Sequence, residues 1–227
     1  AMKDLGIKVL RWPGGNFAGE FNWMDGLLPA DMRAPFQSYL GLETQPHTMG
    51  YDFSEMNTDD FIALCREIGA EPFITINPCW NTPDENAAWV EYCNGDVSTP
   101  YGKLRANRGH QEPYNVQFWS LGNEFGYGHM EGDNTPAGYC QIALENGKKM
   151  LEASPGLSLC SSGPYPNKEW AEFSAKPLAG ISQMISQHYY GYDPHYTDLS
   201  TVEEEYNRCM ASVSRMRELC LLYTSDA

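Results

Sequence analysis

The sequence VQFWSLGNE, residues Val116–Glu124, has the pattern of a buried β-strand that ends in polar side chains. Apolar residues run as far as Gly122, and Asn123 and Glu124 follow directly. A strand with this ending places an amide and a carboxylate at the edge of a sheet, where a substrate can reach both. A carboxylate in that position is suited to acid–base chemistry, and together with a second carboxylate it is typical of glycoside hydrolysis.

Around this stretch, strand patterns and helix patterns alternate along the chain, which predicts a parallel sheet with right-handed crossovers. The expected strands are Ile7–Arg11, Glu71–Asn77, Val116–Asn123, Leu157–Ser162 and Ile181–Tyr190. The expected helices are Thr58–Ile68, Thr82 to Asn94, Asn134 to Met150, Asn167–Lys176 and Glu203–Leu219, and residues 16–57 are expected to form a long loop.

Two α/β architectures satisfy this alternation: a doubly wound sheet and a piece of a β/α barrel. The phosphate-binding motifs GxGxxG and GxxxxGK[ST] are absent, which argues against a nucleotide-binding doubly wound sheet. Polar residues at the ends of several strands favour the barrel, because catalytic residues of such barrels lie at the carboxyl ends of the strands. We therefore expect an α/β fold of the (β/α)8 TIM-barrel type, present here as a partial barrel.

The composition narrows the classes of partner. The chain has 227 residues and a formal net charge of −15, which argues against a nucleic-acid partner and is compatible with a neutral ligand. Its seven cysteines are dispersed without CxxC spacing, so a disulfide framework or zinc site is not expected and a reducing compartment is favoured. No run of apolar residues is long enough to span a membrane, so no membrane partner is expected.

Several polar residues follow the expected strands and should converge at one mouth of the barrel. A sugar presents several hydroxyl groups, each of which needs a hydrogen-bonding partner, so convergence counts for more than any single residue. In chain order these residues are Arg11, Asn16, Asn77, Asn123, Glu124, His188 and Tyr190.

Each of these residues also has a structural interpretation. Glu124 could pair with a Lys or Arg at the start of a loop instead of acting as an acid. His188 could be a structural histidine, and Arg11 could hold the Pro-Gly-Gly turn that follows it. Asn77, which precedes a proline, is interpreted as a strand-ending residue.

Five segments together resemble glycoside hydrolase family 51, whose best-known members are α-L-arabinofuranosidases. They are RWPGGNF (Arg11–Phe17), FNWMDG (Phe21–Gly26), GAEPFITIN (Gly69–Asn77), AAWVEYCNG (Ala87–Gly95) and EPYNVQFWSLGNEF (Glu112–Phe125). The match is collinear from Ile7 to Tyr190. The resemblance implies a (β/α)8 barrel and a retaining double-displacement mechanism with no metal or other cofactor. The implied substrate is an arabinose-containing oligosaccharide or polysaccharide with terminal, non-reducing α-L-arabinofuranosyl residues.

The resemblance also assigns roles to residues. Glu124 matches the general acid/base, and Asn123 matches the amide that contacts the sugar 2-hydroxyl. The other matching residues are expected to bind substrate: Arg11, Asn16, His188 and Tyr190.

The chain departs from the family pattern in three places. Nothing matches the nucleophile, a Glu on a later strand in a segment like DEWN, and a sugar-binding Glu of the first strand would precede residue 1. FGYGHMEG (Phe125–Gly132) replaces a segment like MDGPWQ on the leaving-group side. We therefore expect residues 1–219 to be strands two to six of the barrel and residues 220–227 to be a tail without a family counterpart. The chain alone is expected to be inactive.

Two other functions stay open from the sequence. One is a related barrel glycosidase acting on another sugar, such as a β-glucan or a xyloside. The other is a non-catalytic carbohydrate-binding protein without the nucleophile. The resemblance further suggests a homo-oligomeric, cytoplasmic bacterial protein, although the expected upstream N-terminus leaves secretion open.

Overall fold

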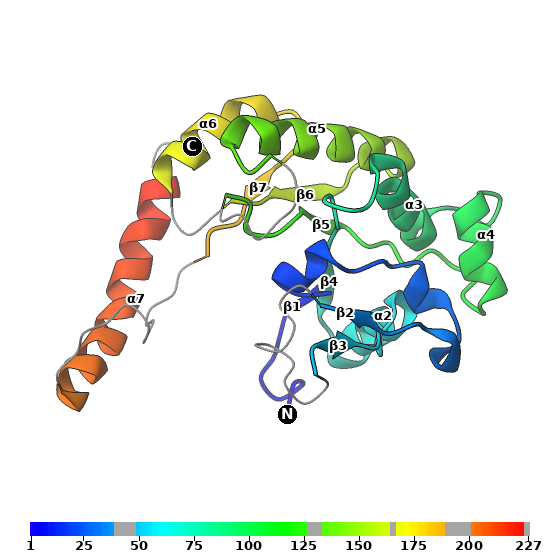
Figure 1. Ribbon diagram of the computed structural model, residues 1–227, viewed down its shortest axis with the longest axis horizontal. Helices are drawn as coiled ribbons and strands as arrows, with labels where there is room; N and C mark the ends of the chain where they lie inside the picture. Colours follow the sequence, from blue (N-terminus) through cyan, green and yellow to red (C-terminus); the bar gives the residue numbers. More distant parts are fainter. Residues whose placement is uncertain (39–48, 127–132, 164–166, 189–200, 225–227) are drawn as a thin grey trace.

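The centre of the molecule is a parallel five-stranded sheet (Figure 1). The computed structural model describes residues 1–38, 49–126, 133–163, 167–188 and 201–224. The strands are neighbours in the order β1 (Val9–Trp12), β4 (Glu71–Thr75), β5 (Phe118–Leu121), β6 (Ser158–Ser161) and β7 (Met184–Ile185). Because this order follows the chain without reversing, the sheet has no switch point of the kind that a doubly wound fold requires. The arrangement is that of a partial β/α barrel.

Helices follow the strands and lie on the outer side of the sheet (Figure 1). Within the described residues, no helix is both long and apolar enough to cross a membrane. The last helix projects away from the sheet in Figure 1, and its apolar side chains such as Tyr206 and Val213 are exposed. The helices are α2 (Thr58–Ile68), α3 (Pro83–Asn94), α4 (Pro100–Asn107), α5 (Pro136–Ala153), α6 (Lys168–Leu178) and α7 (Val202–Thr224).

The helix ends that were predicted most accurately are those with a capping residue or a terminal glycine in the local sequence. The side chain of Asn57 accepts a hydrogen bond from the backbone N–H of Asp60, whose carboxylate accepts one from the Asn57 N–H, and this capping box starts α2. Gly69 ends the same helix in the left-handed conformation, with φ of 76°. At the start of α3, Thr82 and Glu85 form a second capping box.

Three expectations need correction. Residues 16–57, expected to be a loop, contain the 3-10 helices η1 (Asn16–Gly19), η2 (Asp25–Leu27) and η3 (Ala30–Met32), and β2 (Phe36–Gln37) pairs antiparallel with β3 (Tyr51–Asp52). Helix α4 was not expected at all. The last strand is also much shorter than Ile181–Tyr190, because the backbone N–H groups of Ile181 and Ser182 bond to Leu178 O and finish the turn of α6 instead.

Side chains alternate between the two faces of the sheet. One row of paired residues faces the helices, where Trp12 stacks on Phe61 of α2 at a centroid distance of 5.2 Å. That row is Trp12, Ile74, Trp119 and Leu159. The adjoining rows point to the opposite, inner face, and they are Arg11, Phe73, Phe118 and Ser158, then Thr75, Ser120 and Cys160. The outer face is therefore an aromatic core, and the inner face carries polar groups.

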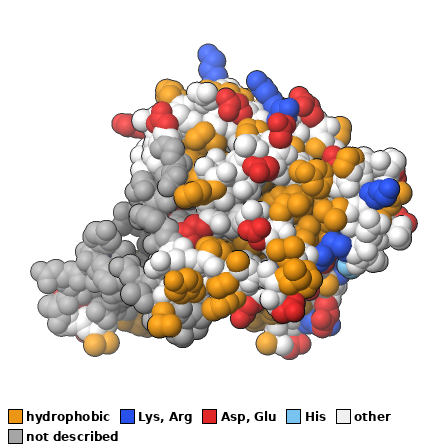
Figure 2. Space-filling model, turned by 45° about the vertical axis from the view of Figure 1, so that its right-hand side comes forward, with side chains coloured by type: hydrophobic (Ala, Val, Ile, Leu, Met, Phe, Trp, Pro, Cys, Tyr) orange, Lys and Arg blue, Asp and Glu red, His pale blue; other side chains and the backbone are white. Residues whose placement is uncertain are grey.

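The segment after β1 covers the outer core with aromatic rings. Phe21 meets Trp12 edge-on at 4.8 Å, and Trp23 stacks on Trp89 of α3 at 6.0 Å. Acidic side chains and apolar clusters share the surface drawn in Figure 2, in keeping with the negative net charge. Phe21 and Trp23 are thus fixed by packing on β1 and α3.

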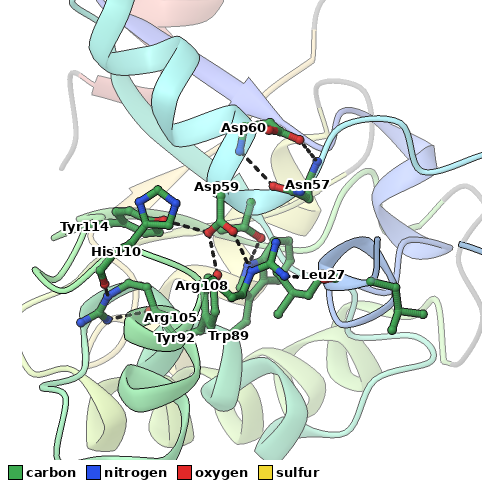
Figure 3. A network of polar contacts seen from close by, with 12 residues as sticks. Leu27, Asn57, Asp59, Asp60, Trp89, Tyr92, Arg105, Arg108, His110 and Tyr114 are labelled. Carbon is green, nitrogen blue, oxygen red and sulfur yellow. Dashed lines mark hydrogen bonds and ion pairs between the residues drawn. The ribbon is translucent and has the colours of Figure 1, made fainter. Parts of the chain in front are cut away.

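A buried carboxylate ties this covering segment to the helices (Figure 3). Asp59 of α2 accepts hydrogen bonds from the hydroxyls of Tyr92 (2.6 Å) and Tyr114 (2.8 Å), and it pairs with Arg108 Nε at 2.9 Å. The same guanidinium donates from Nη1 to the backbone oxygen of Leu27. Asp59 and Arg108 together therefore link α2, α3, the end of α4 and η2.

Arg105 explains why α4 forms where no apolar period predicts a helix. Its guanidinium is fully buried and donates to the backbone oxygens of Tyr92 (2.8 Å), Gly95 (2.9 Å), His110 (3.1 Å) and Gln111 (3.2 Å). A buried cation is tolerated only with such partners, so α4 is held in place by carbonyl groups on both sides of it.

We predict that Asp59→Ala lowers the free energy of unfolding by about 3 to 5 kcal/mol, because the Arg108 cation and two tyrosine hydroxyls lose their shared partner. Asp60→Ala, one residue further along α2, removes only the capping carboxylate and should lower it by about 1 kcal/mol. Urea denaturation of both variants measures the difference. Equal losses would show that the Asp59 network stabilises the fold no more than a single helix cap does.

The same network predicts a fall in stability at alkaline pH. Burial, reinforced by the Asp59 carboxylate, raises the pKa of Tyr92 and of Tyr114 well above the ordinary tyrosine value. The folded protein thus keeps both protons at a pH where the unfolded chain has released them, so stability is full below about pH 10 and falls above it, by up to about 1.4 kcal/mol per pH unit for each tyrosine. Tyr92→Phe should reduce that slope between pH 10 and 11, and an unchanged slope would contradict this origin.

Candidate active site

The turn after β5 places the two polar residues of the GNE sequence. Gly122 has φ of 90°, and a Cβ atom there would lie 2.5 Å from Cε2 of Phe125, so no other residue fits without displacing that buried ring. Glu124 also has a positive φ, 46°, which is uncommon outside glycine. Backbone strain of this kind concentrates at functional sites, where the surrounding structure maintains it.

Arg11 reaches this turn from the inner face of the sheet. Its Nε donates to Thr75 Oγ1 and its Nη2 donates to Asn123 Oδ1, both at 2.9 Å. The guanidinium thus joins β1, β4 and the end of β5, and these contacts lead away from the Pro-Gly-Gly turn that it could have held. Burial lowers the pKa of Arg11, an effect opposed by Cys160 and Glu124, and a guanidinium still stays charged near neutral pH.

The amide of Asn123 is fixed in orientation by its two partners. Because a guanidinium only donates, the Asn123 atom that faces Arg11 is its oxygen. The nitrogen therefore points the other way, and it donates to Asn16 Oδ1 at 2.7 Å. Asn123 is buried, so this chain of three side chains holds the amide rigidly beside Glu124.

Glu124 pairs with a histidine from the other end of the sheet. Its Oε1 lies 2.6 Å from Nδ1 of His188, which follows β7. The side chains are 10% and 21% exposed, so the carboxylate is enclosed and still reachable.

The structure therefore brings together Arg11, Asn16, Asn123, Glu124 and His188, as the sequence predicted. Of the two other residues expected at this edge, Tyr190 lies outside the described residues and Asn77 is considered below. A metal site of the usual kind needs three or more carboxylate, thiol or imidazole side chains close together. The described residues contain no such group.

Asn77 lies at the same edge of the sheet, but its side chain bonds to backbone groups and not to the other predicted site residues. Its Nδ2 donates to the backbone oxygen of Phe21 at 3.2 Å, and its Oδ1 accepts from the backbone N–H groups of Cys79 and Trp80, both at 3.1 Å. It ends the strand and holds the following turn, in agreement with its structural interpretation.

Two neighbours of Arg11 were missed from the sequence. Thr75, which is buried, accepts from Nε, and Cys160 lies close enough for its thiol and the guanidinium to influence each other's pKa. Burial raises the pKa of Cys160 to about 11, with Arg11 acting against it, so the group is a neutral thiol near pH 7. Strand alternation could have predicted both residues, because Thr75 and Cys160 stand at positions of the sheet that face the same side as Arg11.

Comparison with known proteins identifies the family. Residues 1–208 match the family described as Alpha-L-arabinofuranosidase 1 domain. The GH51 α-L-arabinofuranosidase from Thermotoga petrophila RKU-1 superposes with a TM-score of 0.77 at 34% identity, covering 96% of this chain and 44% of that one. The chain belongs to glycoside hydrolase family 51. The resemblance seen in the sequence is confirmed, and so is the partial TIM-barrel fold.

Two relatives show how far the match extends. Alpha-L-arabinofuranosidase C from Emericella nidulans is 35% identical over 178 residues, which are 78% of this chain and 34% of that protein. The intracellular exo-α-(1→5)-L-arabinofuranosidase from Halalkalibacterium halodurans is 30% identical over 196 residues, 84% of this chain and 38% of that protein. The chain therefore spans little more than a third of the length of these two relatives.

We predict that Gly122→Ala lowers the free energy of unfolding by about 3 kcal/mol, since the new methyl group adds a clash with Phe125 to the left-handed strain. Gly156→Ala is the matched control: Gly156 has φ of 88° and nothing within 4 Å of its Cβ position. It should lose only about 1 kcal/mol, from strain alone. Chemical denaturation compares the two, and a Gly122 variant no less stable than the control would contradict the described turn.

Proposed function

We propose that the protein containing this chain hydrolyses terminal, non-reducing α-L-arabinofuranosyl residues from oligosaccharides or polysaccharides. The observation that carries the proposal is the pairing of Glu124 with His188 beside the Arg11–Asn123–Asn16 chain at the strand ends of a family 51 barrel. Family relatives named as α-L-arabinofuranosidases support the choice of sugar.

Glu124 acts as the general acid/base in this proposal. In the first step it gives its proton to the oxygen of the departing sugar chain, while a second carboxylate attacks the anomeric carbon and forms a covalent glycosyl intermediate. In the second step Glu124 takes a proton from water, which displaces that carboxylate and releases arabinose with its anomeric configuration retained. The second carboxylate is the family nucleophile expected on a later strand.

The neighbouring residues position the reacting groups. Asn123 binds the 2-hydroxyl of the furanose, and Arg11 together with Asn16 keeps the amide in a single orientation before the sugar arrives. His188 restrains the Glu124 carboxylate through Nδ1 and lines the pocket, and Tyr190 is assigned to the sugar pocket from the family match. Fixing these groups in advance reduces the reorganisation required in the transition state.

The comparison with the Halalkalibacterium relative extends the proposal to location and mode of attack. That protein is named as intracellular, exo-acting and directed at α-(1→5) linkages. We place the present protein in the bacterial cytoplasm, removing arabinose units from chain ends. Homo-oligomer formation stays a prediction from the family resemblance.

The test is the intact protein with Glu124→Gln. We expect kcat/KM on methyl α-L-arabinofuranoside to fall by about 10² to 10⁴, because a methoxide leaving group requires protonation. The loss on 4-nitrophenyl α-L-arabinofuranoside should be smaller, since nitrophenolate departs without a proton. Glu145→Gln, on the exposed face of α5, is the matched control and should behave as wild type.

Three outcomes would contradict the proposal in different ways. Wild-type activity in Glu124→Gln would remove that residue from the acid/base role. Faster hydrolysis of aryl β-glucosides or β-xylosides than of the arabinofuranoside would show that the substrate carries a sugar other than arabinose. Binding of arabinose-containing oligosaccharides without hydrolysis of any substrate would indicate a non-catalytic binding protein.

A further inference from the structure

Trp80 stands apart from every other tryptophan of the chain. Its side chain is 67% exposed, whereas the other five tryptophans are buried or partly buried in the core. Trp80 lies in the short connection between β4 and α3, which leaves the sheet at the edge where β5 ends in Asn123 and Glu124. A single exposed apolar residue needs no explanation by itself. Whether Trp80 has a function therefore depends on how rigidly the backbone holds it and on what lies next to it.

Hydrogen bonds from buried side-chain amides fix the backbone of the turn that carries Trp80. The side-chain oxygen of Asn77 accepts the backbone N–H groups of Cys79 and Trp80, and Asn77 is itself buried. Asn86 of α3, also buried, donates to the backbone oxygen of Asn77 at 3.0 Å. The backbone under the indole is thus fixed before any ligand arrives, so little conformational entropy is lost when a ligand packs on the ring.

This turn lies against the turn that carries the candidate acid/base. Ile76 N–H donates to Ser120 O at 3.0 Å, so the two strands stay paired up to their ends. Beyond that point, Pro78 Cγ lies 3.1 Å from the Cβ position of Gly122. Trp80 follows this contact by two residues in the connection after β4, and Glu124 follows it by two residues in the turn after β5. Both residues therefore belong to the rim that these two neighbouring connections form at one edge of the sheet.

The sides of the site differ in chemistry. The inner side, with Arg11, Asn16 and Asn123, is enclosed and polar, and it suits the arabinofuranose that is cleaved off. The rim offers an exposed aromatic ring, on which the C–H face of a sugar can stack while its hydroxyls stay in water. Since Glu124 protonates the departing oxygen, the sugar that leaves lies on its outward side.

We propose that Trp80 is a stacking platform for the sugar residue on the leaving-group side of the scissile bond. This inference rests on the proposed function and deepens it: the substrate class is a glycan chain with at least one further sugar beyond the cleaved arabinose, and Trp80 determines the preference for it. The residue contributes binding and takes no part in bond making or breaking.

The experiment compares two substrates with equally poor leaving groups in the intact protein, methyl α-L-arabinofuranoside and α-(1→5)-arabinotriose. Trp80→Ala should lower kcat/KM on the trisaccharide by about 10-fold, mainly through KM, and leave that on the methyl glycoside within about 2-fold. Trp80→Phe, which keeps a ring, should recover most of the loss. Phe173→Ala, at a 51% exposed aromatic on α6, is the control and should change neither substrate.

Two results would overturn the inference. Equal losses on both substrates, accompanied by a lower melting temperature, would show that Trp80 packs against protein and not against a sugar. An unchanged trisaccharide KM in Trp80→Ala would show that no sugar stacks there. Failure of the proposed function is a separate result, because the wild-type protein would then hydrolyse neither substrate.

Discussion

The guanidinium of Arg11 connects the fold to the candidate site. It stands on the inner face of β1 and bonds to the side chains of Thr75 on β4 and Asn123 after β5. A partly buried cation requires such partners, so the position of Arg11 fixes the relative position of three consecutive strands. The same contact sets the orientation of the amide that is proposed to bind the sugar. Structure and function thus share one interaction at this point.

The register of the sheet is what makes this contact possible. Trp12, the next residue, faces outward into the aromatic cluster of Phe21, Phe61 and Trp89. A slip of one residue in β1 would bury Arg11 among those rings and turn Trp12 into the polar interior. The outer core therefore selects the register, and the register presents Arg11, Thr75 and Asn123 to one another.

Local signals in the sequence predicted much of this structure. Helix α2 was predicted at its observed bounds, since its capping box and its terminal Gly69 are encoded within a few residues. The carboxyl ends of the first four strands of the sheet were predicted to within two residues, and five of the predicted site residues meet at this edge. What could not be predicted depends on contacts that no hydrophobic period or motif of the sequence indicates, whether the partner is distant or near in the chain. Helix α4 exists through contacts of Arg105 with backbone carbonyl groups, and β7 is short because Ile181 and Ser182 close the turn of α6.

A crystal structure of the intact protein with bound arabinose tests the central claim most directly. The account predicts that the furanose lies at the carboxyl ends of β1, β5 and β7, with its 2-hydroxyl bonded to the Asn123 amide and its anomeric oxygen next to the Glu124 carboxylate. Arabinose bound in a pocket that contacts neither side chain would contradict the assignment of this strand edge as the active site.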